Sequence, residues 1–182
     1  MSVRKTVTRD AICAVARGII EQDGVDSLSM RTLATELGIK APSLYDHVKS
    51  RDEVIALVQA DGLGDFGAGF AATGNTIRHK VLFYRDWALA NPHLYPVVFQ
   101  QQLHREMLPP GLEAQVLGLV VAAAGGSHIQ ARALWAQLHG MVDLELQGRL
   151  PADADMTATW EAVITAIESA RANEDTSKRG RG

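Results

Sequence analysis

The stretch LSMRTLATELGIKAPSLYDHVKS, residues 28–50, decides the fold, because it places two short helices on either side of a glycine. Ser29 suits the N-cap of the first helix, and Gly38 suits its C-terminal stop. The second helix starts near Ala41 and is barely two turns long. Pro42 fits its first turn, where a missing N–H breaks no hydrogen bond. This spacing is that of a helix-turn-helix, whose second helix enters the major groove of DNA.

The flanking sequence continues the helical pattern in both directions. An earlier helix should begin after Thr8, an N-cap residue, and end at Gly24. Its apolar face holds Ile12, Val15, Ile19 and Ile20. Ser50 followed by Glu53 predicts a capping box at the start of a fourth helix. The glycine-rich segment GLGDFGAGFAATGN, residues 62–75, is predicted to be the joint between this N-terminal module and the remainder.

Five further helices are predicted beyond that joint, each bounded by Gly, Pro, Ser or Thr. They lie in IRHKVLFYRDWALANP, LYPVVFQQQL, PGLEAQVLGLVVAAAGG, SHIQARALWAQLHGMVDLELQG and TATWEAVITAIESA. No series of alternating strands separated by hairpin turns is present in the sequence. We therefore predict an all-α fold of about nine helices, with an N-terminal three-helix DNA-binding module followed by a helical bundle. A disordered tail is expected over residues 173–182.

The charge balance restricts the function. The chain has 182 residues and a formal net charge of -3. Residues 1–60 hold eight Lys/Arg and eight Asp/Glu, whereas residues 61–177 hold seven and thirteen. A neutral N-terminal third disfavours a protein that coats DNA regardless of sequence. The first ten residues lack the apolar core of a signal peptide, and the longest apolar run, 116–126, is far below the ~18 residues of a membrane span. We expect a cytoplasmic protein.

The short third helix has two different sides. Leu44 and Val48 are four residues apart and can pack inward. The outward side carries a cation, an imidazole and hydroxyls, which can donate hydrogen bonds to phosphates and base edges. Two other interpretations remain open: Tyr45 could pack over the second helix, and the charges could form an ordinary solvated face.

The segment LSMRTLATELGIKAPSLYDHVKSRDEVIALV closely resembles the DNA-binding region of the TetR (tetracycline-repressor-like) family. It carries the signature L-A-x-x-L-G-I-x-x-P-S-L-Y-x-H-V-x-x-(K/R), and the match runs without a gap from about Thr8 to Val58. The resemblance implies a DNA-binding domain over residues 1–60 and a ligand-binding and dimerisation domain over residues 75–172.

The resemblance also implies which residues meet DNA. The residues expected to face bases are Lys40, Ala41, Pro42 and Ser43. Those expected to contact phosphates are Tyr45, His47, Lys49 and Arg51, while Arg31 would reach a base or the backbone. A basic N-terminal arm, formed by Arg4, Lys5 and Arg9, could add groove contacts or simply solubilising charge. Ala41 lacks the hydrogen-bonding side chain that some members have there, and Asp46 would repel phosphate or accept from cytosine.

A second resemblance lies in the C-terminal part. The motif W-x-x-x-H-G at Trp135, His139 and Gly140 is similar to the C-terminal domain of one TetR subgroup, and YRDWALANPHLYPVVF is similar to its earlier helices. The implied ligand site would be built from Tyr84, Trp87, Tyr95, Phe99, Trp135 and His139. These side chains could instead form a solid core. The expected ligand is small and largely apolar. Because the set contains no Arg or Lys, a highly anionic ligand is not expected, whereas a neutral or cationic aromatic compound is compatible with it.

Together these features predict a ligand-responsive transcriptional regulator, expected to be a repressor. It should bind a pseudo-palindromic DNA operator as a homodimer and be released by the ligand. The dimer is expected to form through residues 127–148 and 156–172, where Ala133, Ala136 and Gly140 permit close approach. No cofactor, metal site or catalytic motif is recognised: the histidines lack ligand spacing, and no nucleophile elbow or phosphate-binding glycine loop occurs. The alternative is a helical enzyme or ligand carrier without specific DNA binding.

Overall fold

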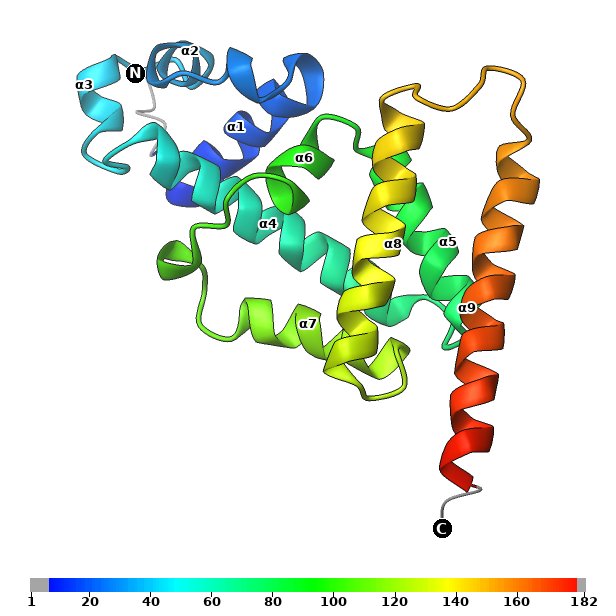
Figure 1. Cartoon of the computed structure of the whole chain (residues 1–182). Helices are drawn as coiled ribbons and strands as arrows, with labels where there is room; N and C mark the ends of the chain where they lie inside the picture. Colours follow the sequence, from blue (N-terminus) through cyan, green and yellow to red (C-terminus); the bar gives the residue numbers. More distant parts are fainter. Residues whose placement is uncertain (1–6, 180–182) are drawn as a thin grey trace. The chain divides into compact units, whose positions relative to one another are not determined.

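The computed structural model describes residues 7–179, with side chains through Ala172, and this part of the chain consists of helices and loops without strands (Figure 1). The nine α-helices are α1 (Arg9–Asp23), α2 (Met30–Glu36), α3 (Ala41–Leu44), α4 (Arg51–Ala72), α5 (Ile77–Ala90), α6 (Leu94–Phe99), α7 (Leu112–Ala123), α8 (His128–Leu146) and α9 (Met156–Arg179). The all-α prediction is confirmed.

Helices α1 and α2 begin and end where the local signals predict, whereas α3 starts at Ala41 as expected but has four residues, shorter than the predicted two turns. The Thr8 hydroxyl accepts a hydrogen bond from the N–H of Ala11 and caps α1, while Ser29 caps α2. Gly24 and Gly38 follow these helices with φ angles of 80° and 70°, in the left-handed region that glycine adopts at low cost. Each of these signals acts over three or four residues.

The predicted capping box at the start of α4 is only half made. The Ser50 hydroxyl accepts from the N–H of Glu53 at 3.1 Å, as expected. The Glu53 carboxylate, however, accepts from the N–H of Lys49 at 2.7 Å rather than from that of Ser50. The side chain of Glu53 therefore binds Lys49, the last residue of the segment 40–49 that contains α3 (the recognition segment), and not the cap residue Ser50.

The glycine-rich segment 62–75, expected to be the joint between the N-terminal module and the remainder, is mostly helical, because α4 continues through the glycines to Ala72. The division between the two compact units of the chain falls inside this segment, between Gly67 and Ala68. A Cβ atom at Gly62 would lie 2.5 Å from the Val98 side chain of α6, and one at Gly69 would lie 2.5 Å from the Phe83 ring of α5. Each glycine in a helix costs about 1 kcal/mol relative to alanine. Here the loss is offset by the close packing of neighbouring helices that a bare backbone allows.

The described chain divides into two compact units. The N-terminal unit comprises the residues through Gly67 together with Asn91–Val116, and the C-terminal unit comprises Ala68–Ala90 together with the residues from Leu117 on. This division differs from the expected domains, since α6 and its loops lie in the same unit as α1–α3.

Buried polar groups fasten α6 to α4 within the N-terminal unit. Gln59 is fully buried, and its amide nitrogen donates to the carbonyls of Val97 and Gln102, at 3.0 Å each. Its amide oxygen accepts from the N–H of His104 at 3.2 Å. Three hydrogen bonds from one buried amide fix the separation of the two segments, because breaking any of them would leave a buried polar group unsatisfied.

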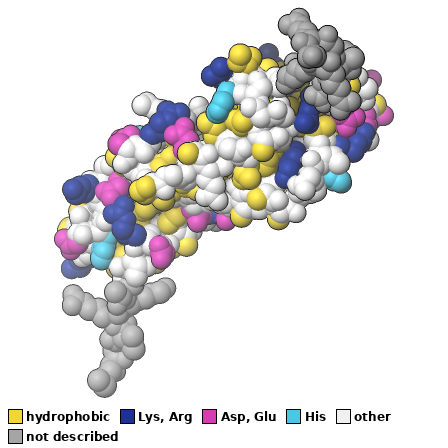
Figure 2. Space-filling view, turned by 90° about the horizontal axis from the view of Figure 1, so that it is seen from below, with side chains coloured by type: hydrophobic (Ala, Val, Ile, Leu, Met, Phe, Trp, Pro, Cys, Tyr) yellow, Lys and Arg dark blue, Asp and Glu magenta, His cyan; other side chains and the backbone are white. Residues whose placement is uncertain are grey.

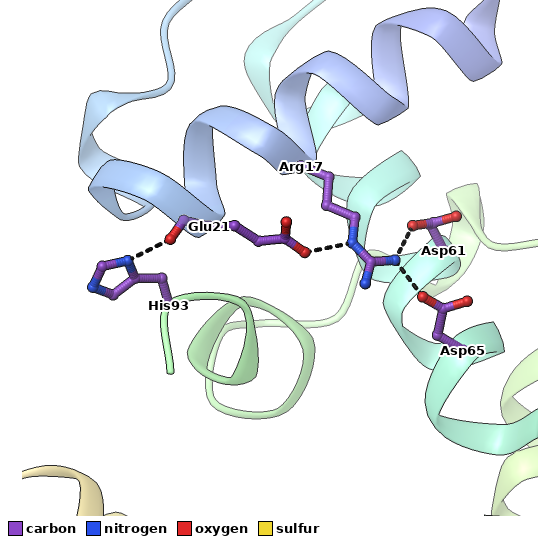
Figure 3. A network of polar contacts seen from close by, with 5 residues as sticks. All are labelled: Arg17, Glu21, Asp61, Asp65 and His93. Carbon is purple, nitrogen blue, oxygen red and sulfur yellow. Dashed lines mark hydrogen bonds and ion pairs between the residues drawn. The ribbon is translucent and has the colours of Figure 1, made fainter. Parts of the chain in front are cut away.

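A charged cluster links α1 to the other side of α4 (Figure 3). The guanidinium of Arg17 donates to Glu21 at 2.7 Å, to Asp61 at 2.6 Å and to Asp65. His93, beside the start of α6, donates from Nδ1 to the carbonyl of Glu21 at 2.9 Å. The cluster thus joins α1, α4 and the residue before α6 within one unit.

The C-terminal unit is organised around α5, which packs against both α8 and α9. Arg85 of α5 donates to both carboxylate oxygens of Glu145 on α8, and Glu145 also accepts from the indole N–H of Trp160 on α9, at 2.7 Å. Trp160 is 1% exposed. This side-chain network connects all three helices.

Two predictions concern the chain ends. The expected disordered tail is helical over residues 173–179, because α9 continues to Arg179, and residues 180–182 lie outside the described residues. Arg4 and Lys5 of the expected N-terminal arm also lie outside them.

Within the described part of the chain, no single helix is long and apolar enough to span a membrane, and α7 with α8 meets that criterion only as a pair bent by 93°.

Candidate functional site

The predicted DNA-facing residues lie on the exposed side of a small helical module. Leu44 and Val48, in α3 and in the turn after it, are fully buried, and α3 packs against α2. The exposed residues of the predicted set are Arg31, Lys40, Pro42, Ser43, Tyr45, His47 and Lys49, while Ala41 is half-buried. The Tyr45 side chain is 52% exposed, so at least half of its surface is available to a partner.

The end of the recognition segment is held by Glu53. Its carboxylate accepts from the backbone N–H of Lys49 and forms an ion pair with the Arg9 guanidinium at 2.7 Å. Arg9 also donates to the carbonyl of His47 at 3.2 Å. Arg9, expected only as part of a basic arm, therefore fixes the backbone beside His47 and Lys49. Sequence reasoning missed this role, because nothing local to Arg9 points to residues almost forty positions away.

We expect the stability of this module to depend on the ionisation of Glu53. The hydrogen bond from the Lys49 N–H, together with Arg9, holds the pKa of Glu53 below its usual value. A lowered folded-state pKa gives stability that is present above the unfolded pKa of about 4.3 and lost as the pH falls through the folded value. Wild-type protein should therefore be more stable than Glu53→Gln near pH 7, and the difference should shrink as the pH falls below about 4.3. Urea unfolding at a series of pH values measures this, and a pH-independent difference would contradict it.

Arg51 points into the module and not outward. Its Nε donates to the carbonyl of Leu28 at 2.8 Å and its Nη2 donates to that of Val25 at 2.7 Å. Two of its three guanidinium nitrogens thus bind backbone of the segment before α2. These hydrogen bonds give Arg51 a structural role in addition to the expected phosphate contact, which stays a prediction. One signal was available in the sequence: a cation in the first turn of a helix opposes the helix dipole and needs another reason to be there.

Three of the predicted ligand residues meet in the C-terminal unit. The ring centroids of Tyr84 and Trp135 are 5.4 Å apart in an edge-to-face arrangement, and those of Trp135 and His139 are 4.9 Å apart. The Tyr84 hydroxyl and Nδ1 of His139 share a hydrogen bond of 2.5 Å. Trp135 and His139 lie one turn apart on α8 and therefore face α5 together.

The space beside these rings is small. A cavity of about 10 Å³ is lined by Phe70, Ile77, Lys80, Val81, Tyr84, Val120, Leu134, Trp135 and Leu138. A volume of this size holds one water molecule at most, whereas ligand pockets usually measure about 300–1,000 Å³. Lys80 is the lining residue that sequence reasoning missed. The sequence feature that could have revealed it is that Lys80 lies on a face of α5 that is otherwise apolar.

The other three predicted ligand residues lie elsewhere. Tyr95 is fully buried in the N-terminal unit and packs against Phe99, which also meets Phe66 of α4 edge to face. Trp87 lies on α5 but is not part of the cavity wall. The structure therefore gathers Tyr84, Trp135 and His139, and it assigns Tyr95 and Phe99 to a different compact unit. Among the residues from 7 to 172, no group of His, Cys, Asp or Glu is arranged to hold a metal ion.

Comparison with protein families identifies both parts of the chain. Residues 12–58 match the profile described as "Bacterial regulatory proteins, tetR family". Residues 78–167 match the profile described as "Tetracyclin repressor-like, C-terminal domain". The two matches lie on either side of the C-terminal half of α4.

Among curated proteins, the chain is similar to the uncharacterized HTH-type transcriptional regulator Rv0681 of Mycobacterium tuberculosis. The two are 28% identical over 173 residues, which span 87% of this chain and 78% of the relative. An HTH-type transcriptional regulator of Saccharopolyspora erythraea is 45% identical over 51 residues, 28% of this chain and 22% of that protein.

Solved structures show the same fold at low sequence identity. The putative regulatory protein SCO4313 superimposes with a TM-score of 0.71 at 22% identity, covering 87% of this chain and 94% of that one. ActR of Streptomyces coelicolor without ligand gives a TM-score of 0.66 at 20% identity, covering 94% and 100%. ActR in complex with (S)-DNPA gives 0.60 at 21% identity, covering 91% and 97%.

Proposed function

Because the chain belongs to the TetR family of bacterial regulatory proteins, we propose that it is a cytoplasmic repressor that binds a pseudo-palindromic operator as a homodimer and is released by a small, largely apolar molecule. As a member of this family it is a transcriptional regulator and not an enzyme. The observation that carries the proposal is the exposed polar side of the segment formed by α3 and the turn after it. The opposite side of this segment is buried through Leu44 and Val48.

The chemistry of this exposed side fits DNA. Lys40, Ser43 and Lys49 supply donors at the start, middle and end of a segment of ten residues. Base edges in the major groove and phosphates on its rim are both acceptors for such groups. Arg31, at the start of α2, is also exposed and adds a cation from a second helix.

A dimer would present two copies of α3 with the symmetry of a palindromic site. Hydrophobic side chains reach the surface between charged ones on the face drawn in Figure 2. In α8, Ile129 is 73% exposed and Leu144 is 40% exposed, with Ala133, Ala136 and Gly140 exposed between them. An apolar stripe of this kind on a helix is typical of a protein interface. We therefore place the dimer contact on α8 and α9.

Two substitutions on the DNA-facing side should have different effects. Lys49→Ala should weaken binding to all sequences similarly and reduce the slope of log K against log salt by about one per subunit, since a phosphate contact is lost. Ser43→Ala should instead change the preference among sequences. Gel shifts with the protein's own upstream DNA and with scrambled DNA, at several salt concentrations, measure both effects. If Ser43→Ala left affinity and base preference unchanged, the base-reading face would be misplaced.

The effector part of the proposal is supported by the cluster of Tyr84, Trp135 and His139, which combines aromatic surface with a polar pair. ActR, whose solved structure has the same fold, binds a small molecule, (S)-DNPA. A ligand that stabilises an arrangement with a different separation of the two α3 helices lowers DNA affinity by its differential binding energy. A thermal-shift screen of apolar compounds, followed by operator release, tests this step.

A further inference from the structure

Lys80 is in an unusual position for a lysine. Its residue is only 8% exposed, whereas the other lysines with described side chains, Lys40 and Lys49, are exposed. Its ammonium donates to the carbonyl of Phe70 and, at 3.2 Å, to that of Thr73, and it lies 4.7 Å from the centroid of the Phe70 ring. None of the carboxylates of the described residues forms an ion pair with it. A buried charge is costly unless it is paired, and neutral dipoles stabilise it less than an anion does.

Lys80 also belongs to the wall of the small cavity in the C-terminal unit. Tyr84, one helical turn further along α5, contributes a hydroxyl that is paired with His139. The remaining lining side chains are apolar or aromatic: Phe70, Ile77, Val81, Val120, Leu134, Trp135 and Leu138. An ammonium has three N–H donors, and two of those on Lys80 bind carbonyls. The site is therefore a single cation at the edge of a cavity lined by apolar and aromatic side chains.

We propose that the effector is an apolar molecule with one carboxylate or a comparable single negative charge, and that this group binds Lys80 in an enlarged form of the cavity. The inference rests on the proposed function, because it assigns the chemical class of the ligand at the effector site. In the structure described here the cavity is packed closed, so the ligand must select a more open state of the same helices. An anion supplies the missing counter-charge, whereas an amine adds a second cation beside the first.

The position of Lys80 also connects this site to α4. The two carbonyls that it binds lie at the C-terminal end of α4, where a cation stabilises the helix dipole and the unsatisfied carbonyls. A ligand carboxylate competes with those carbonyls for the same ammonium. The N-terminal end of α4 carries Glu53, which holds the recognition segment at Lys49. A carboxylate bound at Lys80 would therefore act on the C-terminal end of the same helix.

Two matched series of compounds test the charge preference. The first is 2-naphthoate, 2-naphthylmethanol and 2-naphthylmethylamine, and the second is octanoate, octanol and octylamine. Their dissociation constants are measured by calorimetry or tryptophan fluorescence on the full chain. We expect the carboxylate of at least one series to bind at least about tenfold more tightly than its alcohol, the difference of one charge-assisted hydrogen bond. The amine should bind weakest.

Substitutions at Lys80 test the residue. Lys80→Met keeps the length of the side chain and removes its charge, so the advantage of the carboxylate over the alcohol should fall below about twofold. Lys80→Arg, the matched control, should keep most of the advantage of the carboxylate over the alcohol. If Lys80→Met does not fold, as judged by circular dichroism, Lys80→Gln replaces it, because an amide can still donate to the two carbonyls.

Each outcome decides the inference. The inference of an anionic effector is overturned by any of three results: equal binding of the three head groups, preference for the alcohol or the amine, or no binding by any compound. A carboxylate preference that persists in the neutral variant, Lys80→Met or its replacement Lys80→Gln, also overturns it, because the anion would then bind elsewhere. Operator binding and its release by any compound are measured in parallel. An alcohol that releases the operator would therefore refute the anionic effector while leaving the proposed function intact, and failure to bind operator would refute the proposed function itself.

Discussion

An Ala136→Glu protein should sediment as a monomer and lose at least about a hundredfold of its affinity for a two-half-site operator, because the two copies of α3 no longer bind as one unit. Ala136 lies on the exposed apolar stripe of α8, between Ile129 and Leu144. A carboxylate at the centre of a close helix–helix contact would be desolvated without a partner, which costs several kcal/mol. Wild-type protein is expected at twice 19.7 kDa.

Sedimentation at several protein concentrations, combined with gel shifts on the full operator and on a half-site, gives both quantities. The control is Ala152→Glu, which makes the same change at an exposed alanine in the loop between α8 and α9. It should leave the dimer and the operator affinity as in wild type. A wild-type mass of one chain at all concentrations would refute the dimer contact, and so would an Ala136→Glu protein that remains dimeric.

An Arg51→Met protein should lose about 2–4 kcal/mol of unfolding free energy, with loss of DNA binding as a consequence of that instability. The substitution removes the donors to the carbonyls of Leu28 and Val25 and leaves two partly buried acceptors without their partners. Hydrogen bonds to charged groups contribute about 1.5–3 kcal/mol each, so their loss should exceed that of an exposed charge.

Lys49→Ala is the comparison for this experiment, since Lys49 is exposed and its side chain is a proposed phosphate contact. Urea unfolding should show Arg51→Met destabilised and Lys49→Ala within about 0.5 kcal/mol of wild type. Salt dependence of operator binding, measured below the unfolding transition, should be reduced for Lys49→Ala. If Arg51→Met instead kept wild-type stability and lost about one unit of salt slope, Arg51 would be a phosphate contact as its position in the family motif suggests.

The effector site was only partly predictable. Trp135 and His139 are four residues apart on one helix, so their common direction follows from helical geometry alone. That Tyr84 would be the residue they meet, and that Tyr95 and Phe99 would lie in the other compact unit, depends on how α5 and α6 are packed. Spacing along the chain carries no information about such pairings, because residues fifty positions apart are brought together only by the assembled core.

The sequence by itself determined the helices and the recognition module of this protein. Thr8, Ser29, Gly24 and Gly38 act on backbone groups within four residues, and the spacing of Leu44 and Val48 marks the buried side of α3 and of the turn after it. These effects are local and need no knowledge of the fold.

Only the tertiary structure decided where the polar and glycine residues act. Gly62 and Gly69 of α4 are contact points for α6 and α5, Arg51 binds backbone carbonyls, and Lys80 is buried at the end of α4. For Gly62 and Arg51 the deciding partners, Val98 and Leu28, are distant in sequence, whereas Phe70, a partner of Lys80, lies near the end of the preceding helix. The hydrogen bonds and close contacts that set these roles exist only after the helices have packed, because burial is what makes an unsatisfied charge or an extra Cβ atom costly.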